Sequence, residues 1–130
     1  MLAPEGGRVL FVAGQIGVEG GTALAAQFQA ALANVAAVVE EAGGTVADVG
    51  RLTIYVTDME AYRGSLPEVG AAYRAVFGKH FPAMALVAVT ELVDPRAVVE
   101  VEATAVILRR ALPARRLAAL GARAALSTDR

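Results

Sequence analysis

Residues 8–42 read RVLFVAGQIGVEGGTALAAQFQAALANVAAVVEEA, and they decide how the fold begins. Arg8–Ala13 is rich in β-branched and aromatic side chains, which is typical of a strand. The glycines that follow, beginning at Gly14, predict a loop. Thr22 to Ala42 predicts one long helix, with Thr22 as its N-cap and Gly43-Gly44 as its stop. Apolar residues recur there every three or four positions and predict one buried stripe, made of Leu24, Phe28, Leu32, Val35, Val38/Val39 and Ala42.

Three more strands and a second helix follow along the chain. The strands are predicted at Arg51–Thr57, Ala83–Val89 and Ala97–Ile107, the last after a turn around Asp94-Pro95. Ser65-Leu66-Pro67-Glu68 predicts a capping box at the start of a helix that ends before Gly78. In the resulting order, β-α-β-α-β-β, the helices lie between strands. They can therefore cover one face of a single sheet.

The strand predicted at Ala83–Val89 is apolar on both of its faces, and so is the one at Arg8–Ala13. In a monomer, an antiparallel or mixed sheet with helices on one face shows polar residues on the other. Something other than water is therefore expected to cover the second face. A homo-oligomer whose sheets pack around an axis would do so.

The composition excludes several kinds of protein and site. The chain has 130 residues, no cysteine and one histidine, which argues for one domain without disulfides, a cysteine-based metal site or a multi-histidine site. With 12 basic and 13 acidic residues it has no overall field that attracts nucleic acid. No signal peptide and no apolar run of membrane-spanning length is present. We therefore expect a soluble cytoplasmic protein with no nucleic-acid or membrane partner.

Few residues are candidates for chemistry on their spacing alone. Glu100 and Glu102 fall on one face of the last strand, because strand side chains alternate. They are rim residues, or they pair with arginines, or they include a buried or cleft carboxylate that acts as general acid or base. His80, between a helix end and a strand, is typical of a loop or C-cap residue. Gly17–Thr22 precedes a helix and could cradle an anion, but it matches no phosphate-binding motif, which favours a plain loop.

Five segments, in order, resemble the signatures of the YjgF/Rid family, the reactive intermediate deaminases. Val9–Ile16 (VLFVAGQI) resembles V-F-x-S-G-Q-I, and Gln29–Gly43 resembles a helix that ends in E-A-G. Asp48–Asp58 (DVGRLTIYVTD), Tyr73–Ala83 and Val99–Val106 (VEVEATAV) resemble three further family motifs. The resemblance extends over residues 8–110, nearly the whole family domain.

The resemblance implies a fold, an assembly and an activity. The fold is chorismate-mutase-like α+β, with a single mixed sheet and two helices on one face. The assembly is a barrel-like homotrimer with ligand clefts between subunits. The best-known family activity is the hydrolysis of reactive enamines and imines, formed from amino acids, to 2-keto acids and ammonia. It requires no cofactor and no metal.

The family's functional residues carry over only in part. A strand glutamate handles the attacking water, and Glu100 matches it. Gly14 and Gln15 match the G-Q of the first signature, but Ala13 stands in place of the serine before it. Met84, followed by Ala85, stands where the family has an arginine that fixes the substrate carboxylate. No counterpart of the family's N-terminal tyrosine is expected.

Three hypotheses about the function are compatible with the sequence. In the first, the protein is a trimer whose remodelled cleft binds or processes a small molecule without the usual carboxylate, using Glu100. In the second, it is a working imine/enamine deaminase that recruits another arginine, such as Arg96 or one from a partner's tail. In the third, it is a non-catalytic binding or interaction trimer.

Residues 1–110 are predicted to form the YjgF/Rid-like domain, and residues 111–130 a C-terminal tail. Pro113 predicts the start of a helix in that tail. Its arginines, Arg115, Arg116 and Arg123, predict a solvated face or packing on a neighbouring subunit.

Overall fold

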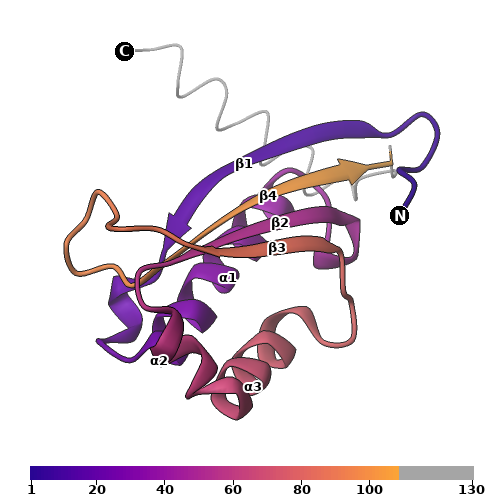
Figure 1. Ribbon diagram of the computed structural model, residues 1–130. Coiled ribbons are helices and arrows are strands. Elements are labelled where there is room, and N and C mark those ends of the chain that lie inside the picture. The colour runs from indigo at the N-terminus through magenta and orange to yellow at the C-terminus, as the bar shows by residue number, and fades with distance from the viewer. Residues whose placement is uncertain (109–130) are drawn as a thin grey trace, which may run out of the picture.

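The computed structural model describes residues 1–108, which form one four-stranded sheet with helices on one side (Figure 1). The elements are β1 (Arg8–Ile16), η1 (Val18–Gly20), α1 (Leu24–Glu41), η2 (Val46–Asp48), β2 (Val49–Val56), α2 (Met59–Arg63), α3 (Leu66–Phe77), β3 (Ala83–Ala88) and β4 (Val99–Ile107). The predicted tail, residues 111–130, and the domain boundary at residue 110 lie outside the described residues.

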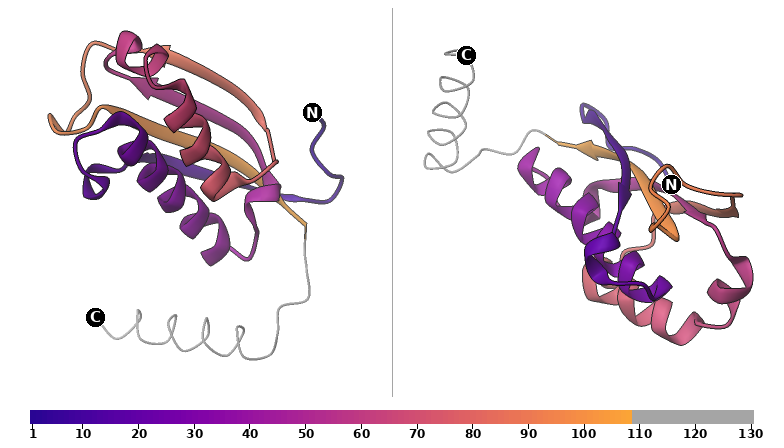
Figure 2. Two further views of the ribbon diagram at one scale, coloured as in Figure 1. Left: turned by 90° about the horizontal axis from the view of Figure 1, so that it is seen from below. Right: turned by 90° about the vertical axis from the view of Figure 1, so that its left-hand side faces the viewer.

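The sheet is mixed, as predicted. Its strand order is β1-β4-β2-β3, with β2 and β3 parallel and both other pairs antiparallel. α1 and α3 lie side by side across one face (Figure 2). Strands β1 and β3 are the two edges of the sheet.

The core lies between that sheet face and the two long helices. Alternate strand residues point into it, including Leu52, Ile54, Val56, Val99 and Val101, all at most 3% exposed. They meet the stripe of α1, in which Phe28, Leu32, Val35 and Val39 are also at most 3% exposed. The period of two in the strands and of three to four in the helix therefore produces the two halves of one core.

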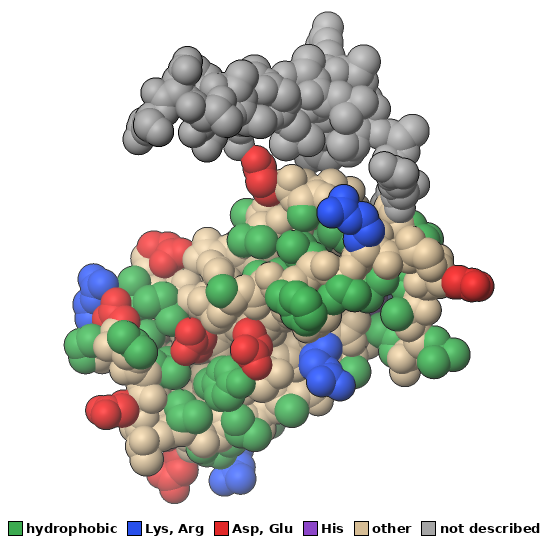
Figure 3. Space-filling model, turned by 90° about the horizontal axis from the view of Figure 1, so that it is seen from above, with side chains coloured by type: hydrophobic (Ala, Val, Ile, Leu, Met, Phe, Trp, Pro, Cys, Tyr) green, Lys and Arg blue, Asp and Glu red, His purple; other side chains and the backbone are tan. Residues whose placement is uncertain are grey.

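The face of the sheet away from the helices, here called the open face, carries the other set of strand residues. These are Val9, Phe11, Arg51, Thr53, Tyr55, Ala83, Ala85, Val87, Glu100, Glu102, Thr104 and Val106. Phe11 is 81% exposed and Val9 56%. Figure 3 shows hydrophobic side chains gathered over this face, with acidic and basic ones among them. The predicted apolar second faces of β1 and β3 are therefore exposed in a single protomer, whereas the central strands β4 and β2 carry mostly polar residues on the open face.

The first helix differs from its prediction at its start. It begins at Leu24, with the extended residue Ala23 as its N-cap and no side-chain cap, so the prediction of Thr22 was wrong. The stop is as predicted: Gly43 has a φ of 91° and the amide of Gly44 donates to the carbonyl of Val39. Within the stripe, Val39 is buried, but Val38 and Ala42 are exposed, because they lie at the margin of the face that packs on the sheet.

The capping box predicted at Ser65 is also wrong. The hydroxyl of Ser65 donates to the carbonyl of Ala61 at 2.7 Å instead of accepting from α3. It does so because a short helix that the sequence pattern did not predict, α2, ends immediately before it. Asp58 caps that helix by accepting from the amide of Ala61 at 3.0 Å.

The strands are where the sequence predicts them, with shifted ends. β1 continues through Gly14 to Ile16, so the prediction that a loop begins at Gly14 was wrong. The register between β1 and β4 shifts between Val12 and Gln15, which marks a β-bulge. This bulge keeps the strand paired on both sides of Gly14. The other three strands differ from their predicted bounds by one or two residues at an end.

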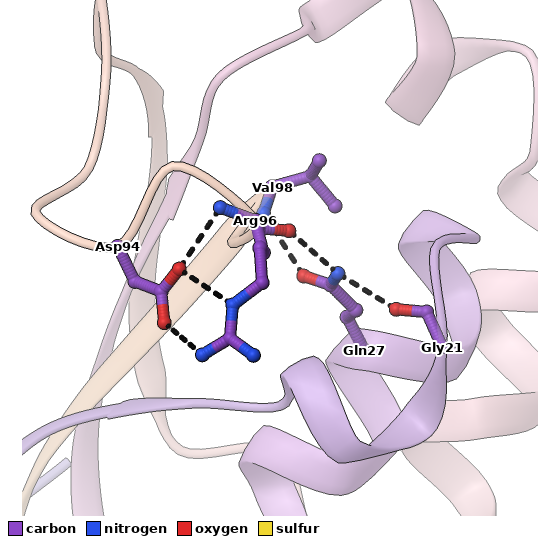
Figure 4. Close-up of polar contacts among 5 residues, drawn as sticks. All are labelled: Gly21, Gln27, Asp94, Arg96 and Val98. Carbon is purple, nitrogen blue, oxygen red and sulfur yellow. Dashed lines mark hydrogen bonds and ion pairs between the residues drawn. The ribbon is translucent and has the colours of Figure 1, made fainter.

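A buried glutamine on α1 holds the loop between β3 and β4. The side chain of Gln27 is 1% exposed. Its Nε2 donates to the carbonyls of Gly21 and Arg96 at 2.8 and 2.9 Å, and its Oε1 accepts from the amide of Val98 at 2.9 Å (Figure 4). Because every polar atom of the amide is paired, its burial is tolerated, and the start of β4 is fixed against α1.

Candidate functional site

The bulge in β1 lies directly against Glu100 of β4. Ala13 and Gly14 form the bulge, and Ile16 pairs with Glu100 in the ladder. A Cβ atom added at Gly14 would lie 2.2 Å from Oε1 of Glu100, so any other residue would displace the carboxylate. The side-chain Nε2 of Gln15 donates back to the carbonyl of Ala13 at 3.0 Å. Ala13, Gly14, Gln15 and Glu100 therefore form one cluster at the β1 edge.

The two glutamates of β4 share the open face, as their spacing predicts, but they differ in their partners. The hydroxyl of Tyr55 donates to Oε1 of Glu102 at 2.8 Å. This hydrogen bond is the main reason that the pKa of Tyr55 is raised, with smaller effects from desolvation and from the charges of Glu102 and Glu100. No donor within residues 1–108 bonds to the half-buried carboxylate of Glu100. Glu100 is therefore the one of the two that is available to a ligand or a water molecule.

Met84 and Ala85 lie at the other edge of the sheet, on β3. Met84 pairs with the core residue Leu52, so it points to the helix side, and it is 45% exposed. Ala85 points to the open face. β2 lies between β3 and β4, so Met84 and Glu100 are two strand spacings, about 10 Å, apart across the sheet. They are also offset along the strands, because Met84 is in register through Leu52 with Ala103, three residues from Glu100, and they lie on opposite faces. Within one protomer the structure does not bring all the predicted site residues together.

A cavity of about 240 Å³ opens beneath β3, on the helix side. Met84 and Leu86 of β3 form one wall, and Tyr62 of α2 and Arg74 of α3 lie around it. The remaining lining is largely apolar: Phe28, Ile54, Leu66, Val69, Gly70, Tyr73 and Phe81. The sequence pattern did not single out Tyr62 or Arg74. Tyr62 lies on the unpredicted helix α2, and Arg74 lies on the predicted second helix, where one arginine gives no periodic signal.

His80 has a structural role in this fold. Its Nε2 lies 2.8 Å from the carbonyl of Val49, which makes that nitrogen the protonated one, and its amide donates to Phe77. The hydroxyl of Tyr73 donates to the carbonyl of His80, and burial raises the pKa of that tyrosine. These contacts hold the turn into β3, in agreement with the loop reading of His80.

The glycine-rich loop before α1 has a packing explanation. A Cβ atom at Gly17 would lie 2.0 Å from the carbonyl oxygen of Gln27, and one at Gly20 would lie 2.4 Å from that of Ala26. The glycines thus let the loop lie directly on the helix. This contact favours the plain-loop reading over an anion cradle.

Arg96, one of the arginines considered as a substitute for the family's own, is already paired. Its Nε and Nη2 donate to the two carboxylate oxygens of Asp94 at 3.1 and 2.7 Å (Figure 4). The hydrogen bond from Arg96 is the main cause that lowers the pKa of Asp94 to about 2. Both groups lie in the exposed loop before β4, and neither lines the cavity beneath β3.

Within residues 1–108 no group of three or more histidine, aspartate or glutamate side chains is arranged to hold a metal ion. No helix in that range is long and apolar enough to cross a membrane.

The chain matches the family model described as Endoribonuclease L-PSP over residues 3–107. The chain belongs to the YjgF/Rid family. Over 109 residues it is 38% identical to the 2-iminobutanoate/2-iminopropanoate deaminase of Escherichia coli K12, an alignment that covers 77% of this chain and 80% of that protein. It is also 36% identical, over 110 residues, to a RutC family protein of Pyrococcus horikoshii, with 79% and 82% covered.

Solved structures of YjgF/Rid proteins have the same fold. Rv2704 of Mycobacterium tuberculosis, a member of the YjgF/YER057c/UK114 family, is 38% identical with a TM-score of 0.66, over 82% of each chain. The YjgF gene product of E. coli is 34% identical with a TM-score of 0.64, over 85% of this chain and 91% of that one. The single mixed sheet with its helices on one face is thus the YjgF/Rid fold.

Proposed function

We propose that this protein is a cofactor-independent hydrolase of small imines and enamines that acts as a homotrimer. The observation that carries the proposal is the position of Glu100. Its half-buried carboxylate lies over Gly14 on the open face, without a hydrogen-bond donor from residues 1–108. A carboxylate with free acceptor atoms beside apolar surface is suited to hold and deprotonate a water molecule. The identity to a protein named as an imine deaminase supports the same chemistry.

The reaction consists of water addition, cleavage of the C–N bond and proton transfers, with no redox step. Water adds to the imine carbon while Glu100 takes one of its protons, and the imine nitrogen gains a proton. The C–N bond of the resulting carbinolamine then breaks, which releases ammonia and leaves a carbonyl group. Imine and water thus give a 2-keto acid and ammonia with no net oxidation or reduction. A positioned general base commonly contributes about 100-fold or more to such a step.

Two observations support the homotrimer: the exposed open face, and the separation within one protomer of the Glu100 cluster from the cavity beneath β3. The exposed apolar side chains of the sheet face would be buried in an oligomer, and another copy of the chain presents the same apolar side chains for this contact. In one protomer Glu100 and the cavity beneath β3 lie at different edges of the sheet. We propose that a cleft between subunits joins the Glu100 cluster of one protomer to the β3 cavity of the next. Because the expected substrates arise from amino acids, the cytoplasm remains the predicted location.

Met84 and Ala13 distinguish the proposed cleft from that of the family's deaminases. Both are apolar where the family has a charged or a polar side chain, and Met84 contributes a polarizable apolar wall. We propose that this wall favours ligands with an apolar side chain. The same replacements favour a second candidate function, in which the trimer binds a small metabolite without turning it over.

The proposed function is tested by the rate of 2-keto acid release from 2-imino acids, which an L-amino acid oxidase generates in place. We expect the purified chain to accelerate release over spontaneous hydrolysis, saturably and without added cofactor. Alanine, 2-aminobutanoate and leucine as precursors give side chains of increasing apolar size. No acceleration with any precursor, from a preparation that light scattering shows to be trimeric, would contradict hydrolysis and favour the binding protein.

A further inference from the structure

The cavity beneath β3 contains one cationic side chain, and it comes from α3. Arg74 lines the cavity together with Met84, while the other walls are largely apolar. The two residues come from different elements, so the cavity has a cation on its helix wall and an apolar strand wall opposite. A pocket of this kind can hold a ligand with an anionic end and an apolar end.

Gly70 shapes the position of that arginine. It lies one helical turn before Arg74, and a Cβ atom added there would lie 3.2 Å from Nη1 of Arg74 and 4.0 Å from both Cζ and Nη2. The guanidinium therefore lies along the bare backbone of Gly70. A larger residue at position 70 would fill the space that the guanidinium occupies.

The guanidinium of Arg74 is free to bind an anion. No carboxylate within residues 1–108 pairs with it, whereas the guanidinium of Arg96 binds both carboxylate oxygens of Asp94. Arginine presents a planar fork of donors that matches a carboxylate in a two-point contact. Arg74 thus has the chemistry of a carboxylate anchor, and it lies across the cavity from the position where the family places its own.

We propose that Arg74 fixes the carboxylate of the substrate, and that Met84, Leu86 and Val69 receive an apolar side chain. This assignment rests on the proposed function and deepens it. The substrate class becomes small 2-imino acids with apolar side chains, and the anchoring charge reaches the cleft from a helix instead of from β3. Arg74 acts by binding and orienting the substrate, while Glu100 handles the water.

The test compares a charged with an uncharged substrate in three variants. The charged substrates are 2-imino acids. The uncharged control is the imine that an amine oxidase makes from butylamine, which lacks the carboxylate. Arg74→Gln removes the charge, Arg74→Lys keeps it without the fork, and Arg63→Gln removes an exposed arginine of α2 that does not line the cavity.

For Arg74→Gln we expect kcat/KM for imino acids to fall by about 10- to 100-fold, mainly through KM, as for loss of a charge-assisted contact. Its rate with the uncharged imine is expected to change less than about twofold, because no carboxylate is bound. Arg74→Lys should lose less than Arg74→Gln, because it keeps the positive charge. Arg63→Gln should have the kinetics of the wild type. Equal kinetics of Arg74→Gln and wild type on imino acids would overturn the assignment and leave hydrolysis standing.

Binding of 2-oxobutanoate, an unreactive product, is measured by calorimetry on the same proteins. If the wild type hydrolyses no imine yet binds 2-oxobutanoate in a way that Arg74→Gln abolishes, the Arg74 assignment is supported and hydrolysis is contradicted. If the wild type shows neither hydrolysis nor binding, both proposals fail. A loss in Arg74→Gln that is as large for the uncharged imine would indicate a structural role and overturn the anchor.

Discussion

Replacing Glu100 with glutamine is expected to lower kcat for imino acid hydrolysis by about 100-fold or more while leaving the fold intact. Glutamine has the same shape and can still occupy the space over Gly14, but it cannot accept a proton from water. The measurement is kcat from initial rates of 2-keto acid release, with circular dichroism and light scattering to verify fold and assembly. Because no donor in residues 1–108 bonds to Glu100, the substitution leaves no hydrogen-bond partner stranded.

The matched control is Glu102→Gln, on the same strand and the same face. Its Oε1 can still accept the hydrogen bond from Tyr55, so we expect a change in kcat of less than about threefold. Equal losses in the two variants would indicate a general effect of charge on the open face. Retention of activity by Glu100→Gln would remove Glu100 from the chemistry.

Replacing Phe11 with aspartate is expected to dissociate the homotrimer into monomers. Phe11 is the most exposed large hydrophobic side chain of β1, at 81%, and it lies on the open face. An aspartate there would place a charge in the proposed interface of every subunit. Burying an unpaired charge costs several kcal/mol, so the dissociation constant should rise by about a thousandfold or more. Light scattering over a concentration series measures the mass, and the activity should fall with it.

Val93→Asp serves as the control for that substitution. Val93 is fully exposed, in the loop between β3 and β4 and away from the open face, so this variant should keep the mass and activity of the wild type. A Phe11→Asp variant that stays trimeric would show that the open face is not the interface. A wild-type chain that is monomeric would contradict the proposed cleft between subunits.

The sequence predicts the elements that follow a regular period. Alternation identifies the four strands and places Glu100 beside Glu102, and the stripe from Phe28 to Val39 identifies the first helix. The apolar open face follows from the same alternation. These features depend on residues close together in the chain, which is why pattern alone reveals them.

The features that pattern misses depend on contacts between distant residues or on elements too short to show a period. The bulge at Gly14 is fitted to Glu100, which lies far along the chain. Gln27 is buried because a loop some 70 residues later satisfies its amide. The helix α2 has five residues, too few to show a helical repeat. Arg74 stands out only when α3 is packed under β3.

The central claim is that the site joins Glu100 of one subunit to the β3 cavity of another, and mixing two inactive variants tests it most directly. Glu100→Gln removes the base. Met84→Glu places a charge in the wall that receives the apolar side chain of the substrate and in the cavity that Arg74 lines, at a position that is 45% exposed and so tolerates it. Each trimer alone should be nearly inactive. Refolding the two together at equal amounts should give about one quarter of the wild-type activity, because each cleft needs one residue from each of two neighbours. No recovered activity, in mixed trimers verified by native mass spectrometry, would contradict the account.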